Sequence, residues 1–149
     1  MTETEERTKI LALSQAHTIV FFDGVCSLCN GVVSTLVTQD RGHKLRYAPL
    51  QGKTAEAVLS AADRQKLSTV IVLKNSRLYR RSDAVIVVLL DLPAGPPVRP
   101  LFWLKILRKI PRPFRELGYF LVARWRYRIF GQSDTCRIPS PEERELFLD

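Results

Sequence analysis

A buried strand that runs directly into two closely spaced cysteines is the feature that most limits how this chain can fold. Residues 17 to 23, HTIVFFD, are β-branched and aromatic, which is typical of a strand buried inside a sheet. Residues 26 to 39, CSLCNGVVSTLVTQ, have the apolar spacing of a helix, with Cys29 on its apolar stripe. We therefore expect Cys26 at the N-terminus of a helix that follows a buried strand.

The pattern that follows predicts a mixed sheet covered by helices. The expected elements are a strand over 44–50, a helix over 53–67, a strand over 68–73, a strand over 77–82 and a helix over 83–92. The turn between the last two strands makes them a hairpin, and Ser82 is expected to cap the helix after it. An alternation of this kind is typical of an α/β domain.

The segment PAGPP, residues 93 to 97, is a clear break in this pattern. Beyond it we expect two helices, over 100–110 and 113–130, with Pro113 at a first helical position. The chain then divides into a polar N-terminal segment (1–16), a core (17–92), a basic helical extension packed on the core (98–131) and a polar C-terminal tail (132–149).

The net charge of +8 is concentrated in one stretch of the chain. Between Arg99 and Arg128 there are nine basic residues and one acid, Glu116, whereas the rest of the chain has fourteen of each. These basic side chains can simply be the solvated faces of helices, or they can attract an anionic membrane surface or an acidic protein. No recognised nucleic-acid motif accompanies them, so nucleic acid is not expected as a partner.

The composition is that of an ordinary soluble protein, with 46% hydrophobic and 26% charged residues. The longest apolar run, AVIVVLL at 84–90, is far too short to span a membrane, and residues 1–16 lack the apolar core of a signal peptide. We therefore expect a cytoplasmic protein. In such a reducing compartment a CxxC pair is more often catalytic or metal-binding than a structural disulfide.

Two cysteines at this spacing can carry out thiol–disulfide exchange. Unpaired N–H groups and the helix macrodipole stabilise a thiolate at Cys26, and thiols in such motifs titrate at roughly 3.5 to 7.5. Cys29 lies one turn further along and is expected to be more buried and less reactive. We predict that Cys26 forms a mixed disulfide that Cys29 resolves. Asp23, at the end of the strand, could relay the proton of the resolving thiol if it lies beneath the pair.

Other roles remain open for these residues. The cysteines could be zinc ligands or small packing residues, and Asp23 could serve only to form the turn with Gly24. A tetrahedral zinc site needs two more ligands, and the sequence offers no second CxxC. The only further candidates are Cys136, His17 and His43. We therefore expect no bound metal and no bound cofactor.

The stretch DGVCSLC at 23–29, with APLQ at 48–51, resembles the DCC family of thiol-disulfide oxidoreductases, which is named for its Asp-Cys-Cys signature. The resemblance continues through SDAV at 82–85, IPRPFRELGYFLVARWRYRIFG at 110–131 and CRIPSPEERELFL at 136–148. It covers nearly the whole chain from residue 17 and implies a thioredoxin-like fold. Carried over by position, the signature residues are Asp23, Cys26 and Cys29.

The sequence thus predicts one thioredoxin-like domain with a basic helical C-terminal extension, acting as a thiol-disulfide oxidoreductase on a protein or small-molecule disulfide. Its catalytic residues would be Cys26, Cys29 and Asp23. The rival hypothesis is a non-catalytic interaction module with structural cysteines, whose basic surface binds an acidic partner or an anionic membrane. A redox potential in the cytosolic range would favour the enzyme, and inert thiols would favour the module.

Overall fold

The computed structural model describes residues 2–66, 69–92, 100–132 and 138–148, with the side chains of 100–104 left aside. Its elements are α1 (Glu3–Ala16), β1 (Thr18–Phe22), α2 (Ser27–Gln39), β2 (Leu45–Pro49), α3 (Lys53–Val58), α4 (Ala61–Gln65), β3 (Ile71–Lys74), β4 (Arg77–Arg80), α5 (Arg81–Asp91), α6 (Pro100–Lys109), α7 (Arg112–Phe130) and the short 3-10 helix η1 (Arg144–Leu146).

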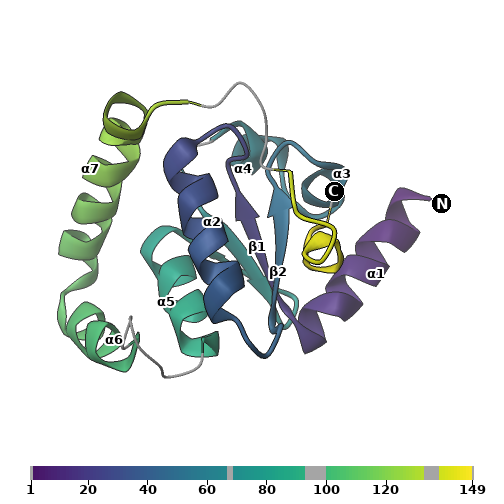
Figure 1. Ribbon diagram of the computed structural model, residues 1–149, viewed down its shortest axis with the longest axis horizontal. Helices are drawn as coiled ribbons and strands as arrows, with labels where there is room; N and C mark the ends of the chain where they lie inside the picture. Colours follow the sequence, from purple (N-terminus) through teal and green to yellow (C-terminus); the bar gives the residue numbers. More distant parts are fainter. Residues whose placement is uncertain (1, 67–68, 93–99, 133–137, 149) are drawn as a thin grey trace.

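The four strands form one mixed sheet in the order β2-β1-β3-β4. The central strand β1 runs parallel to β2 and antiparallel to β3, and β4 closes the hairpin with β3. Helices cover both faces of this sheet (Figure 1). The predicted fold class, a thioredoxin-like mixed sheet covered by helices, is confirmed.

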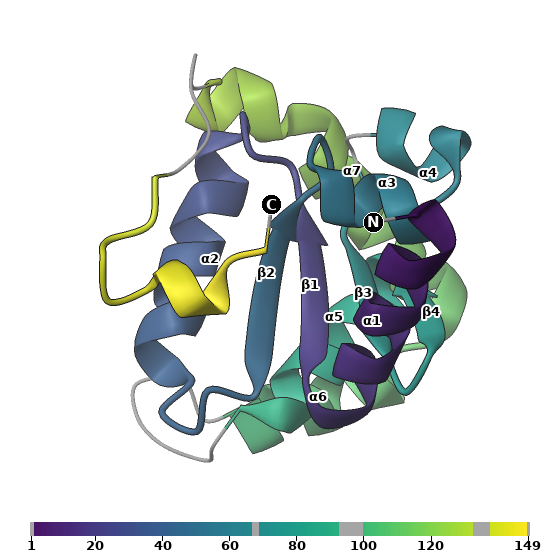
Figure 2. The same ribbon diagram turned by 90° about the vertical axis from the view of Figure 1, so that its right-hand side faces the viewer.

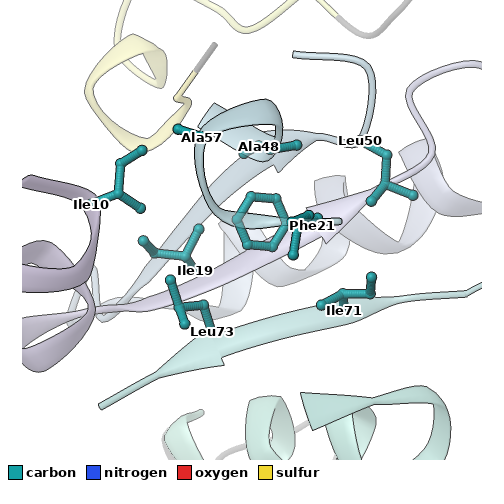
Figure 3. Packing of buried hydrophobic residues seen from close by; sticks show 10 residues of the cluster. Ile10, Ile19, Phe21, Ala48, Leu50, Ala57, Ile71 and Leu73 are labelled. Atoms are coloured by element: carbon teal, nitrogen blue, oxygen red, sulfur yellow. The ribbon is translucent and has the colours of Figure 1, made fainter. Parts of the chain in front are cut away.

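Every residue of β1 is buried, which explains its unbroken apolar sequence. Because side chains alternate along a strand, Ile19 and Phe21 face one side of the sheet, and Val20 and Phe22 face the other. Figure 3 shows the first side, where Phe21 lies among side chains from the neighbouring strands and from the helices above them. The sheet therefore separates two distinct apolar clusters.

Helices α1 and α3 cover the Phe21 side of the sheet (Figures 1 and 2). α1 falls in the polar segment to which the sequence analysis assigned no secondary structure. The helix α1 has a capping box between Thr2 and Glu5, yet it buries only Ile10 and Ser14. An apolar stripe this thin leaves no clear helical period in the sequence.

Helices α2 and α5 cover the opposite side, and α7 lies beyond them at the edge of the molecule (Figure 1). The tail also reaches this side, where Phe147 packs on Tyr47 with ring centroids 5.3 Å apart. The Leu148 N–H donates to the Tyr47 carbonyl at 2.7 Å, so the tail lies along β2, one of the two edge strands of the sheet. Although polar in composition, the tail is anchored through these residues.

The single helix predicted over 53–67 is wrong, because the chain forms α3 and α4 with a break between them. Leu59 and Ser60 adopt extended backbone, and the Ser60 side chain accepts a hydrogen bond from the Asp63 N–H. Serine is a favoured N-cap, and here it starts a new helix within a run of good helix formers.

The predicted cap at Ser82 is also wrong. Helix α5 starts two residues earlier than predicted, with Arg80 as its N-cap, and the Ser82 hydroxyl donates instead to Glu116 of α7. The break expected at 93–97 lies outside the described residues. None of the helices within the described ranges combines the length and the apolar composition needed to cross a bilayer.

Candidate dithiol site

Cys26 is the N-cap of α2, as the strand-to-helix spacing predicted. Its sulfur accepts a hydrogen bond from the Cys29 N–H, with 3.4 Å between nitrogen and sulfur. Its own N–H donates to the Asp23 carbonyl at 3.3 Å, which closes the turn between β1 and α2. Both cysteines are free thiols. The Cys26 sulfur therefore lies where the unpaired N–H groups of the helix start converge.

The predicted order of burial of the two cysteines is wrong. Cys26 is 0% exposed, whereas Cys29 is only partly buried. The chain that leaves α7 forms an antiparallel bridge between Gln132 and Cys26, so this segment lies beside the helix start. Sequence spacing places a residue along a helix, but it does not show which distant segment covers it.

Cys29 is held in its protonated form. Burial raises the pKa of its thiol, and a hydrogen bond to Cys26 and the negative charge of a Cys26 thiolate raise it further. The positive charge of Arg126 lowers it, but only in part, and the resulting pKa is about 12. At neutral pH Cys29 is therefore a thiol.

Asp23 follows β1 directly and is 1% exposed. One carboxylate oxygen accepts hydrogen bonds from the Val25 N–H at 3.1 Å and from the Gln51 side-chain amide at 3.0 Å. The other accepts from the Arg126 guanidinium at 3.2 Å and from the Tyr127 hydroxyl. A buried carboxylate with these partners is fixed in place and paired with a cation.

Arg126 joins the carboxylate to the dithiol. Its side chain is 5% exposed, and its second terminal nitrogen donates to the Cys29 sulfur at 3.4 Å. Burial lowers the pKa of this guanidinium, but the charges that Cys29, Tyr127, Cys26 and Asp23 carry when ionised outweigh that effect and raise it above its usual value. Arg126 therefore carries a permanent positive charge beside both the thiol and the carboxylate.

Tyr127 completes the cluster. Burial raises the pKa of its hydroxyl, the hydrogen bond that it donates to Asp23 raises it further, and the result is about 12. The hydroxyl also accepts from Arg126 at 2.8 Å, and the guanidinium carbon lies 4.5 Å from the centre of the ring. Tyr127 is therefore a neutral donor that keeps Asp23 and Arg126 aligned.

The structure brings Asp23 and Cys29 to the same guanidinium and sets Cys26 beside them. Sequence reasoning missed Arg126, Tyr127 and Gln51 as members of this site. The signal was present, because Gln51 belongs to APLQ and the other two to the segment WRYRIFG, which both carried the family resemblance. The sequence predicted a helix there, but its basic residues were interpreted only through their charge.

The residues that the sequence offers as metal ligands are not gathered here. His17 directly precedes β1 and the dithiol follows it, so the two lie at opposite ends of this strand, and His43 lies just before the parallel strand β2. Cys136 lies outside the described residues. In the part of the chain that the structure describes, no three His, Cys, Asp or Glu side chains are placed to share a metal ion.

A thioredoxin-like sheet whose first strand leads to a helix capped by a CxxC motif defines a protein of the thioredoxin-like dithiol class. The chain belongs to the DCC1-like thiol-disulfide oxidoreductase family, whose model matches residues 20–132. It is similar to the uncharacterized protein YuxK of Bacillus subtilis, with 30% identity over 87% of this chain and 93% of that protein. It is also similar to a chloroplastic DCC family protein of Arabidopsis thaliana, with 36% identity over 80% of this chain and 69% of that protein. No solved structure matches the chain.

Proposed function

We propose that the protein is a thiol-disulfide oxidoreductase in which Cys26 is the nucleophile and Cys29 the resolving thiol. The arrangement of the two sulfurs carries this proposal. The Cys26 sulfur accepts an N–H at the start of α2, a position that stabilises a thiolate. The pKa of Cys29 is raised to about 12, so Cys29 stays protonated until the resolving step.

The reaction balances as an ordinary two-step exchange. The Cys26 thiolate attacks one sulfur of a substrate disulfide, that bond breaks, and the first substrate thiolate leaves and takes up a proton. Cys29 then loses its proton and attacks the Cys26 sulfur, which releases the second substrate thiol. Two electrons pass to the substrate and the pair becomes a disulfide. The cytoplasm, which keeps such pairs reduced, is the compartment we propose.

We assign Arg126 and Asp23 to the second step. Attack by Cys29 requires its thiolate, and Arg126 lowers the pKa of that thiol against the effect of burial. Asp23 fixes Arg126 in position and is our candidate acceptor for the proton that Cys29 gives up. Support for this role comes from the single guanidinium that contacts both groups. Replacing Asp23 by Asn should slow resolution more than attack.

The test is a trapping experiment with bis(2-hydroxyethyl) disulfide, read by intact mass. Cys29→Ser should accumulate a mixed disulfide on Cys26, and the matched variant Cys26→Ser should accumulate none. Wild-type protein should end as the internal disulfide. An adduct that forms only in Cys26→Ser would reverse the two roles. Thiols that react in neither variant, together with a wild-type pair that never oxidises, would refute the enzyme and favour structural cysteines.

A second function is favoured by the outer face of α7. Its exposed large apolar residues are Leu117, Phe120, Leu121, Trp125, Ile129 and Phe130, whereas Phe114 and Val122, also exposed, line a cavity beneath the helix. The exposed arginines Arg124 and Arg128 lie among them, and Arg128 stacks on the Trp125 ring. We propose that this face binds an anionic membrane surface, because an interfacial helix combines apolar side chains with basic ones in this way.

Vesicle co-sedimentation tests the membrane proposal. Binding to vesicles with anionic lipid should exceed binding to neutral vesicles and should fall steeply as salt is added. The double variant R124E/R128E should lose it, whereas R7E/R41E, which makes the same change of charge at exposed sites outside α7, should keep most of it. Equal binding by the two double variants, or no binding to anionic vesicles at low salt, would refute the proposal.

A further inference from the structure

A cavity of about 550 Å³ lies between the sheet and the helices α2, α5, α6 and α7. Its wall is almost entirely apolar and includes Phe22 of β1, Val33 of α2, Val88 of α5 and Val122 of α7. Cys29 is part of the same wall. Small-molecule sites are commonly clefts of roughly 300 to 1,000 Å³ lined by apolar side chains with a few polar groups. Here one of those polar groups belongs to the dithiol.

Among the residues that the structure describes, the charged side chains of the cavity wall are two arginines, and no acidic residue lines it. Arg126 is committed to Asp23, Tyr127 and Cys29. Arg115 is less well satisfied, because its Nε and one terminal nitrogen are buried without a hydrogen-bond acceptor among the described residues.

The nearest acidic partner of Arg115 is shared with a second arginine. An Asp83 oxygen lies 3.7 Å from Arg115, and Asp83 also pairs with Arg112 at 3.3 Å. One carboxylate between two guanidinium groups leaves a net positive charge at this end of the cavity. The charge favours an anionic group on the occupant.

The positions of the arginines along α7 set the length of that occupant. At a rise of 1.5 Å per residue, Arg115 and Arg126 lie about 16 Å apart along the helix. Between them, Gly118 lines the cavity, and a Cβ placed there would meet no atom within 4 Å. Glycine is disfavoured in the interior of a helix. At this position its lack of a side chain leaves room within the cavity.

We propose that the cavity binds a small-molecule disulfide whose apolar arm ends in an anionic group. The disulfide would lie at the Cys29 end of the cavity, where the neighbouring Cys26 sulfur attacks it, and the anion would lie at Arg115. The inference rests on the proposed thiol-disulfide exchange and names its substrate class. The reaction is the one given above: the substrate R–S–S–R′ takes two electrons and two protons from the pair and leaves as RSH and R′SH. Cys26 and Cys29 finish as a disulfide.

The test uses prereduced protein in single turnover, so no external reductant is needed. The probe is the mixed disulfide of 8-mercaptooctanoic acid and 2-mercaptoethanol, and bis(2-hydroxyethyl) disulfide is the reference. Burial of each methylene is worth roughly fourfold, so the probe should react at least about tenfold faster at low concentration. The analogue with an amine in place of the carboxylate should lose most of this advantage, and Arg115→Gln should remove the difference between acid and amine.

Two glycine variants provide the matched control. Gly118→Leu fills space at the cavity wall and should lower the ratio of probe rate to reference rate at least about fivefold, the loss of one to two buried methylenes. Gly31→Leu adds the same side chain to α2, where a Cβ also meets nothing within 4 Å but the position does not line the cavity. It should leave the ratio unchanged. A ratio that falls equally in both variants would overturn the inference.

Binding without chemistry gives an independent readout. Octanoate, which has no sulfur, should bind saturably in calorimetry, and Gly118→Leu should weaken that binding; no saturable binding would overturn the inference. Reduction of bis(2-hydroxyethyl) disulfide without preference for the octanoic probe would overturn it as well and leave the proposed function standing. Failure to react with any disulfide would refute the proposed function itself, and the inference with it.

Discussion

On one face of the sheet, α1 and α3 pack against Ile19 and Phe21. On the other, α2 and α5 cover Val20 and Phe22, and α7 lies one layer further out, with the cavity, the dithiol and the buried Asp23–Arg126 pair beneath it. The same strands build both faces, because alternate side chains point in opposite directions. One side of the sheet therefore carries an apolar core, and the opposite side carries the candidate site.

The difference shows how a small domain can hold costly groups. A buried ion pair and an open cavity both weaken a fold, since charges lose their hydration and cavity walls lose packing contacts. Here they are confined to one face, next to a helix with many exposed apolar side chains. The opposite face buries a continuous apolar cluster, and this cluster should supply much of the stability that the functional face lacks.

The largest predicted effect compares two adjacent residues of β1. Phe21 is 0% exposed in the α1 and α3 cluster, so Phe21→Ala should lower the free energy of unfolding by about 3–5 kcal/mol. Phe22 is also buried, but its side chain lines the cavity and has fewer packing contacts to lose. Phe22→Ala should therefore cost at least about 1 kcal/mol less. Urea unfolding measures both, and equal losses would break the contrast between the faces.

The next effect is the loss of the buried cation. Arg126→Met leaves Asp23 buried without its ion-pair partner, which usually costs about 3–5 kcal/mol. The remaining donors, Tyr127, Gln51 and the Val25 N–H, should hold the loss near the lower end. Adding Asp23→Asn should recover part of the lost stability, because the unpaired charge is then removed.

The matched control for Arg126→Met lies on the same helix. Arg115 pairs with Asp83, whose side chain is 37% exposed, so Arg115→Met should cost less than about 1 kcal/mol. Denaturant unfolding of the wild type, Arg126→Met, Asp23→Asn and the double variant forms the cycle, and Arg115→Met is measured beside these four. Similar losses for Arg126→Met and Arg115→Met would show that the buried pair carries no special weight.

The last predicted effect is a loss of stability in alkaline solution. The pKa of Cys29 rises from 9.0 to about 12 in the folded protein, so above pH 9 the unfolded chain releases this proton first. The contribution of this pKa shift to stability is fully present below pH 9 and is lost as the pH rises toward 12. The free energy of unfolding falls by at most about 1.4 kcal/mol per pH unit for one group. The raised pKa of Tyr127 acts in the same direction. Urea unfolding at several alkaline pH values checks this, and Cys29→Ser should flatten the slope. A stability that rises with pH would contradict it.

Much of the fold follows from local pattern. The run 17–23 predicted β1, and the cysteine spacing predicted the start of α2, because a buried strand and a capped helix leave signals within a few residues. The predictions failed where a distant contact or a competing local cap decides the structure. Ser60 ends one helix and starts another, and Ser82 turns its hydroxyl to Glu116, 34 residues away.

The site divides in the same way. Asp23, Cys26 and Cys29 fall within seven residues, so their proximity follows from chain order. Arg126 lies 103 residues further along the chain than Asp23, and no periodic pattern in the sequence indicates that the two side chains pair. The burial of Cys26 beside Gln132 was missed for the same reason. In the sequence, an arginine that makes a long-range contact looks the same as any other basic residue on a helix.

The anchoring of the tail along β2 has a consequence for synthesis. An open sheet edge offers unpaired backbone groups to other chains, and here Phe147 and Leu148 cover part of that edge. They are made about 100 residues after β2, so at 5–20 residues per second the edge stays uncovered for roughly 5 to 20 s. During that interval a nascent chain can pair with a neighbour on the same message. Crowded translation should therefore favour aggregation of this protein more than dilute refolding does.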